Sequence, residues 1–174
     1  MSQALLVVDM LNDFVLEDGA LTVGPAGKQI IPPIRERIQE YRQKGDLILY
    51  VADCHAPDDK EFNMFPPHCI KGEEGAEIVS ELRPQDAANE RVIPKRRYSA
   101  FYGTDLDLTL KEKGIHQLEL TGVCTNICIL YTAADARMRY YDVTVRADTV
   151  ASFDEAAHNF ALKEMEHTLG VKII

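Results

Sequence analysis

Asp9, Lys95 and Cys128 lie far apart in the chain, yet each follows an apolar run that is typical of a strand. A thiol near a carboxylate that can accept its proton, and near a fixed cation, is the arrangement of a covalent hydrolase. We therefore interpret Cys128 as a nucleophile, Asp9 as its base and Lys95 as the cation that holds the pair together. Taken singly, each residue has an ordinary alternative: a packed cysteine, a turn-forming aspartate and a solvated surface lysine.

The residues around Cys128 predict a nucleophile at the start of a helix. Thr125 is suited to cap a helix over residues 126–140, and Cys128 would then be the third residue of that helix. The unpaired peptide N–H groups and the partial positive charge of a helix start favour the thiolate, which is the reactive form of cysteine. The backbone N–H groups of Cys124 and Cys128 could hold a developing oxyanion.

A fourth segment carries residue types that bind divalent metals. Asp53 and His55 are two residues apart at a predicted strand end, so an extended chain places both side chains on one face. His68 follows two prolines, whose rigidity fixes its direction. Glu61 lies between them on the same loop. Two imidazoles and two carboxylates suit zinc, or equally iron or manganese, with one coordination position left for water or a ligand atom.

Three other carboxylates near Glu61 could take its place as a ligand: Asp58, Asp59 and Glu73. An Asp-x-His pair alone is also common among ordinary polar loop residues. The metal interpretation therefore depends on the four ligands meeting in space.

The chain alternates apolar strands with amphipathic helices, which predicts a parallel sheet with helices on both faces. Ligands bind to such sheets outside the carboxyl ends of the strands, where Asp9, Asp53, Lys95 and the turn from Gly122 to Cys128 fall. We expect strands at residues 4–8, 47–52, 91–94, 117–121, 143–146 and 171–174. We expect helices at residues 27–44 with Gly45 as the cap, at 76–82, at 104–113, at 126–140, and from a capping box of Ser152 and Glu155 to about His167.

Composition narrows the class of protein. A chain of 174 residues, 46% of them hydrophobic, suits one domain spanning residues 1–174. A net charge of −9 without a basic face argues against nucleic acid as a partner. No apolar run approaches the roughly 20 residues that cross a bilayer, and the N-terminus lacks the features of a secretory signal. We therefore expect a cytoplasmic protein without a membrane partner, whose four cysteines are free thiols.

These motifs together resemble the nicotinamidase branch of the isochorismatase-like cysteine hydrolases, over nearly the whole chain. The Asp, Lys and Cys segments are the mark of the superfamily, and the pairing of Asp-x-His with Pro-Pro-His points to nicotinamidase. The residues that carry the resemblance are Val8-Asp9-Met10-Leu11-Asn12-Asp13-Phe14, Asp53-Cys54-His55, Phe65-Pro66-Pro67-His68-Cys69, Lys95-Arg96-Arg97-Tyr98-Ser99-Ala100-Phe101 and Gly122-Val123-Cys124-Thr125-Asn126-Ile127-Cys128.

The resemblance implies an α/β fold of three layers, built on a six-stranded parallel sheet. It implies hydrolysis of nicotinamide to nicotinate and ammonia in NAD salvage, with Asp9, Lys95 and Cys128 as the triad. It also implies a cis peptide between Val123 and Cys124. The aromatic walls of the site would be Phe14, Phe65 and Tyr98. Many relatives place a second histidine between the Asp-x-His and the Pro-Pro-His; this chain has none there, and some members use a glutamate, as Glu61 would be.

Two other functions fit parts of the same pattern. An amidase of the same superfamily could act on pyrazinamide, which differs from nicotinamide by one ring nitrogen, or on a carbamoyl compound. A thiol or metal sensor could use Cys124 and Cys128, but it would leave Asp9 and Lys95 without a role. The sequence leaves the oligomeric state open, a homo-oligomer included.

Overall fold

The computed structural model describes residues 3–174, which form a sheet of six parallel strands in the order β3-β2-β1-β4-β5-β6. The strands are β1 (Gln3–Val8), β2 (Leu47–Asp53), β3 (Glu90–Lys95), β4 (Gln117–Val123), β5 (Asp142–Ala151) and β6 (Lys172–Ile173). The helices are α1 (Asn12–Val15), α2 (Pro25–Gln29), α3 (Ile31–Lys44), α4 (Leu106–Glu112), α5 (Leu130–Met138) and α6 (Glu155–His167).

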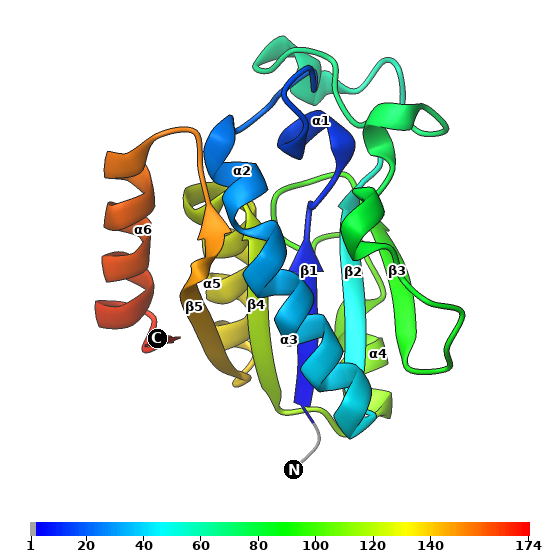
Figure 1. The fold of residues 1–174 in the computed structure, drawn as a ribbon. Helices are drawn as coiled ribbons and strands as arrows, with labels where there is room; N and C mark the ends of the chain where they lie inside the picture. The colour runs from blue at the N-terminus through cyan, green and yellow to red at the C-terminus, as the bar shows by residue number, and fades with distance from the viewer. Residues whose placement is uncertain (1–2) are drawn as a thin grey trace.

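Helices cover both faces of the sheet, so the predicted three-layer α/β architecture is confirmed. In Figure 1, α3 crosses the front of the sheet while α4 and α5 lie behind it. The strand β1 is buried on both faces, which is typical of a central parallel strand. Its alternate residues Leu5 and Val7 belong to the core under α3, whereas Leu6 and Val8 belong to the core under α4 and α5.

The helix α3 follows the expected amphipathic pattern but begins later than expected. Ile34, Ile38 and Tyr41 are buried on one face, and Gly45 caps the helix in the left-handed conformation. Residues 27–44 do not form one helix, because α2 ends at Gln29 and α3 begins at Ile31. Two prolines stand in the first turn of α3, where their missing N–H groups cost nothing, but they could not continue a preceding helix.

Several predicted boundaries are wrong. Residues 76–82 form no α-helix but two 3₁₀ turns, Glu74–Ala76 and Ser80–Leu82. The helix expected over 104–113 is α4, which is shorter at both ends. The cap of α6 is Asp154, whose side chain accepts a hydrogen bond from Ala157 N, because Ser152 instead donates to Asn126 Oδ1. The strand β5 continues to Ala151, five residues beyond the expected end.

Among the residues that the structure describes, no helix is both long and apolar enough to cross a membrane.

Gly122, on the central strand β4, faces the backbone of β1 at very short range. A Cβ placed on it would lie 1.9 Å from Val8 O, and its φ of +113° disfavours any L side chain. We therefore expect Gly122→Ala to lower the free energy of unfolding by more than about 3 kcal/mol, measured by urea denaturation.

Gly45 provides the control for that substitution. It also has a positive φ, +69°, but a Cβ there would meet nothing within 4 Å. Gly45→Ala should therefore cost only about 1 kcal/mol, the cost of the left-handed backbone alone. An equal loss of unfolding free energy in the two variants would show that the close contact of Gly122 with β1 does not cause the destabilisation.

Candidate active site and metal site

The carboxyl ends of three strands of the sheet bring the candidate catalytic side chains together. Asp9 follows β1, Lys95 ends β3, and Cys128 lies in the turn after β4. Lys95 Nζ is 2.8 Å from Asp9 Oδ2, and it lies 3.5 Å from Cys128 Sγ as a hydrogen-bond donor. All three side chains are buried. The structure thus places the three residues at one end of the sheet and in contact with one cation.

Asp53 is part of the same ionic cluster. Lys95 Nζ donates a hydrogen bond to Asp53 Oδ1, and the backbone N–H of Asp53 donates to Asp9 Oδ1 at 2.9 Å. Oxygen atoms of the two carboxylates and Cys128 Sγ lie within 4.8 Å of one another. Lys95 is therefore balanced by two buried acids, one of which is also a candidate metal ligand.

Burial and charge set the protonation of this cluster. Burial, together with the neighbouring Asp53, raises the pKa of Asp9 to about 6, although Lys95 opposes this shift. Burial would lower the pKa of Lys95, but the carboxylates of Asp53 and Asp9 outweigh it and the pKa rises overall, so the ammonium remains charged. A carboxyl group that titrates near neutral pH is well matched to general acid–base work.

The expectation of a resting thiolate at Cys128 is wrong. Burial raises the pKa of the Cys128 thiol well above its usual value, and the attraction of Lys95 does not offset this. The predicted cap is also wrong: residues Thr125–Ile129 form a turn of π-helix before α5, and Thr125 Oγ1 pairs with His158 Nδ1 at 2.8 Å. Burial therefore favours the protonated thiol, and attack needs a base that removes its proton.

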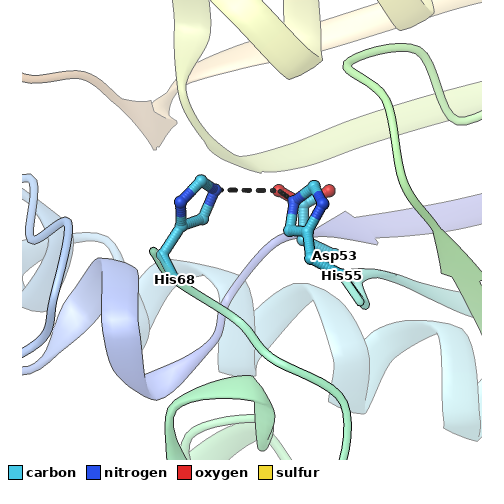
Figure 2. A group of neighbouring side chains, drawn as sticks. All are labelled: Asp53, His55 and His68. Atoms are coloured by element: carbon cyan, nitrogen blue, oxygen red, sulfur yellow. Dashed lines mark ion pairs between the residues drawn. The ribbon is translucent and has the colours of Figure 1, made fainter. Parts of the chain in front are cut away.

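The candidate metal ligands also converge, as Figure 2 shows for Asp53, His55 and His68. Asp53 Oδ2 lies 3.6 Å from His55 Nε2 and 4.0 Å from His68 Nε2. One ligand atom from each of the three residues lies within 4.8 Å of the others, and all three residues are buried. This group was predicted from Asp53 at a strand end and from two histidines in the segment that follows it.

The hydrogen bonds of the two imidazoles test whether this group fits a metal. His55 Nδ1 lies 3.1 Å from Asp59 Oδ2, and His68 Nδ1 lies 2.7 Å from Pro66 O. A carboxylate and a carbonyl can only accept, so each Nδ1 carries a proton and each neutral ring presents a lone pair at Nε2. His55 Nε2 is buried without a hydrogen-bond partner. Lone pairs that converge on a carboxylate oxygen fit a cation held between them.

The charge around His55 also favours a cation. Burial lowers the pKa of His55, but the neighbouring carboxylates of Asp53 and Asp59 outweigh it, so the pKa rises overall. A site that attracts a proton in this way attracts any positive charge, and a metal ion would compete with the proton for Nε2.

Glu61 lies beside this group rather than within it. Its Oε1 is 3.9 Å from His68 Nε2, and the side chain is buried against the same cavity. Its role as a fourth ligand stays a prediction. Of the carboxylates that could have replaced it, Asp58 and Glu73 are exposed, and Asp59 is turned toward the other nitrogen of His55.

A cavity of about 350 Å³, counting the space open to solvent, joins the two groups. Phe14, Phe65 and Tyr98 all line it, as expected of aromatic walls. Phe153 and Leu21, which were not predicted from the sequence, also border the cavity. Phe153 directly follows Ser152 after the end of β5, so the strand-end rule would have found it had the length of β5 been predicted correctly. The full lining is Asp9, Phe14, Leu21, Asp53, Glu61, Phe65, His68, Tyr98, Val123, Cys124, Ile127, Cys128 and Phe153.

The peptide bond between Val123 and Cys124 is cis, which confirms what the resemblance implied. Cys124 is buried and lines the cavity next to Cys128. The use of the backbone N–H groups of Cys124 and Cys128 as an oxyanion hole stays a prediction.

The chain is similar in sequence and in structure to members of one protein family. The model of the isochorismatase domain matches residues 3–173. The crystal structure of nicotinamidase/pyrazinamidase PncA from Bacillus subtilis is 39% identical, with a TM-score of 0.96 over 99% of each chain. The pyrazinamidase of Pyrococcus horikoshii, crystallised in complex with zinc, is 34% identical, with a TM-score of 0.91 over 100% of this chain and 99% of that one.

Relatives of different activity are also similar. N-carbamoylsarcosine amidase from Thermoplasma acidophilum is 37% identical, with a TM-score of 0.88 over 99% of this chain and 95% of that one. Similarity in sequence and fold therefore does not identify the substrate. The residues that line the cavity provide the evidence for it.

Proposed function

The chain belongs to the isochorismatase domain family, and from this we propose that it is a single-domain amidohydrolase that converts nicotinamide to nicotinate and ammonia. One observation carries the proposal: the buried cluster of Cys128, Asp9 and Lys95 opens onto an aromatic-walled cavity that the group of Asp53 and His68 also borders. A thiol with a base serves acyl transfer, and aromatic walls suit contact with a flat ring.

The reaction proceeds through a thioester on Cys128. Cys128 Sγ attacks the carboxamide carbon while Asp9 takes the thiol proton, and backbone N–H groups stabilise the oxyanion. Asp9 then returns the proton to the leaving nitrogen, the C–N bond breaks, and ammonia departs. Asp9 next takes a proton from water, which attacks the thioester; the C–S bond breaks and the thiol is restored with the release of nicotinate. Lys95 stays charged and offsets the negative charge of Asp9 in each stage at which that carboxylate has given up its proton.

The proposed cofactor is one divalent ion, with zinc as the first choice and iron or manganese as alternatives. It would be held by Asp53, His55 and His68, with Glu61 as the proposed fourth ligand. When bound, the ion would supply positive charge and an open coordination position for the ring nitrogen of the substrate.

The charge of the cavity favours a neutral aromatic amide over a carbamoyl amino acid. Its lining includes the acids Asp9, Asp53 and Glu61, but no lysine or arginine. Lys95 lies beneath these residues and is paired with two carboxylates. A carbamoyl amino acid would bring its own carboxylate to this acidic wall without a free side-chain cation to meet it. Nicotinamide and pyrazinamide carry no such charge.

We expect the purified, zinc-loaded protein to release ammonia from both nicotinamide and pyrazinamide. The value of kcat/KM for an N-carbamoyl amino acid should be at least about 100-fold lower, because it lacks the flat ring that the aromatic walls would contact and no lysine or arginine lines the cavity to meet its carboxylate. Ammonia release, measured with a coupled assay on the three substrates in parallel, checks this result. Absence of ammonia from nicotinamide, or faster turnover of the carbamoyl acid, would refute the assignment.

The alternative of a thiol sensor is disfavoured by the same electrostatics. Burial raises the pKa of Cys124 to about 12, and that of Cys128 is also raised. Redox-sensing cysteines need thiolate character and access to solvent. Nicotinate production would instead give this protein a cytoplasmic role in NAD salvage.

A further inference from the structure

Asp59 lies behind His55, on the side away from the converging metal ligands. Its Oδ2 is 3.1 Å from His55 Nδ1, and its Oδ1 accepts a hydrogen bond from the backbone N–H of Glu61 at 3.0 Å. The Asp59 side chain is only 4% exposed, although the residue lies on a long loop. One carboxylate therefore contacts a ligand ring with one oxygen and the backbone of the next ligand candidate with the other.

Arg97 holds this carboxylate from the opposite side. Its Nη1 lies 3.0 Å from Asp59 Oδ1 and 3.2 Å from Asp59 Oδ2, and it is 3.8 Å from Glu61 Oε2. Arg97 comes from the segment directly after β3, two residues beyond Lys95. The pair thus ties the loop that carries the metal ligands to the strand end that carries the catalytic cation.

We propose that Asp59 is a positioning residue for the metal site, which keeps the proton of His55 on Nδ1 and its Nε2 lone pair directed at Asp53. The inference rests on the proposed metal site. A free neutral histidine exchanges its proton between the two nitrogens, and only one of these tautomers leaves Nε2 available. A carboxylate that accepts from Nδ1 selects this tautomer, fixes the ring and makes Nε2 a stronger ligand. For His68, the backbone carbonyl oxygen of Pro66 accepts from Nδ1 in the same way. Because this oxygen belongs to the backbone, no side-chain substitution removes it.

Zinc affinity, measured by competition with a chromophoric chelator, tests the proposal without using enzyme activity. We expect Asp59→Ala to weaken zinc binding by about 10- to 100-fold, the usual effect of removing a partner of a metal-bound histidine. Asp58→Ala is the matched control: it removes the same side chain from the neighbouring position, where the residue is exposed. The zinc affinity of this variant should equal that of the unaltered protein.

Two further variants separate positioning from loss of fold. Asp59→Asn keeps one oxygen that can accept from His55 Nδ1, so it should recover part of the affinity. Arg97→Ala removes a side chain that is 43% exposed and leaves Asp59 in place, so it should fold and weaken zinc binding by less than Asp59→Ala. Thermal melts of the metal-free proteins show whether each variant is folded, and Arg97→Ala carries the test if Asp59→Ala is not.

The tautomer itself can be observed in the metal-free protein by ¹⁵N-detected NMR of the histidine side chains. His55 should carry its proton on Nδ1, and Asp59→Ala should shift it toward Nε2. Folded Asp59→Ala with unchanged zinc affinity, or His55 protonated on Nε2 alone in the unaltered protein, would overturn the proposal. If the unaltered protein binds no zinc, this inference and the proposed metal site both fail, while ammonia release from nicotinamide still tests the amidase assignment separately.

Discussion

Cys128→Ala abolishes ammonia release from nicotinamide, with an expected loss in kcat/KM of at least about 10⁴-fold. Cys128 is the one thiol in contact with Lys95, and its sulfur lies within 4.8 Å of carboxylate oxygens of Asp9 and Asp53. Without the Cys128 sulfur no thioester can form beside Asp9 and Lys95; Cys124 also lines the cavity, but the hydrogen bond from Lys95 goes to Cys128. A water molecule acting directly would retain only the contribution of binding and of the oxyanion donors.

Cys54→Ala is the control for this variant, because Cys54 is also a free thiol but is not among the residues that line the cavity. It should keep the activity of the unaltered protein. Mass spectrometry of the unaltered protein, quenched with acid during turnover, should show the added mass of the nicotinoyl group on the peptide that contains Cys128. Substantial turnover by folded Cys128→Ala, or an acyl group found on another residue, would show that the nucleophile is wrongly assigned.

The site could be predicted from the sequence to the extent that it depends on strand ends. Asp9, Asp53 and Lys95 each end an apolar run, and parallel strands place their carboxyl ends at one edge of the sheet. The order of the strands was not needed for this prediction. The convergence of His55 and His68 rested on two local rules, the alternation of side chains along an extended chain and the stiffness of the two prolines before His68.

The properties that depend on burial could not be predicted in the same way. The proposed thiolate at Cys128 followed from the position of a helix start, but the buried environment reverses the direction of the pKa shift. The contact of Asp59 with His55 Nδ1 depends on the path of the loop, and no spacing rule separates Asp59 from the exposed Asp58. Such features arise from tertiary contacts that leave no periodic pattern in the chain.

The double role of Asp53 is a further feature that only the structure shows. Its Oδ1 accepts from Lys95 while its Oδ2 faces both imidazoles. The ammonium that supports the nucleophile and the proposed metal therefore share one carboxylate. A change of charge at either site should therefore alter the electrostatics of the other. The largest such change is the removal of the Lys95 ammonium.

Lys95→Met should destabilise the metal-free protein by about 3–5 kcal/mol at pH 7, the usual cost of leaving buried charges without their partner. Methionine has a similar volume, so the effect reports charge rather than packing. The Lys95 side chain has no exposed surface and lies between the buried carboxylates of Asp9 and Asp53. The same variant should lose amidase activity, because Asp9 would no longer be held beside Cys128 by the ammonium.

The pH dependence of this destabilisation distinguishes charge from general damage. Without Lys95, burial and mutual repulsion raise the pKa values of Asp9 and Asp53 in the folded protein above their unfolded values near 3.8. The folded variant then binds protons that the unfolded chain does not, so its free energy of unfolding falls as pH rises from about 4 through the raised pKa values. The difference from the unaltered protein should therefore be largest at pH 7 to 8 and shrink toward pH 4. Urea denaturation of chelator-treated protein across this range measures the difference.

Lys111→Met is the control, because it removes a mostly exposed lysine paired with Asp107. It should change the free energy of unfolding by no more than about 0.5 kcal/mol at any of these pH values. A difference for Lys95→Met that stays below about 1 kcal/mol at pH 7, or that does not change with pH, would show that the two carboxylates do not depend on this ammonium for their charge.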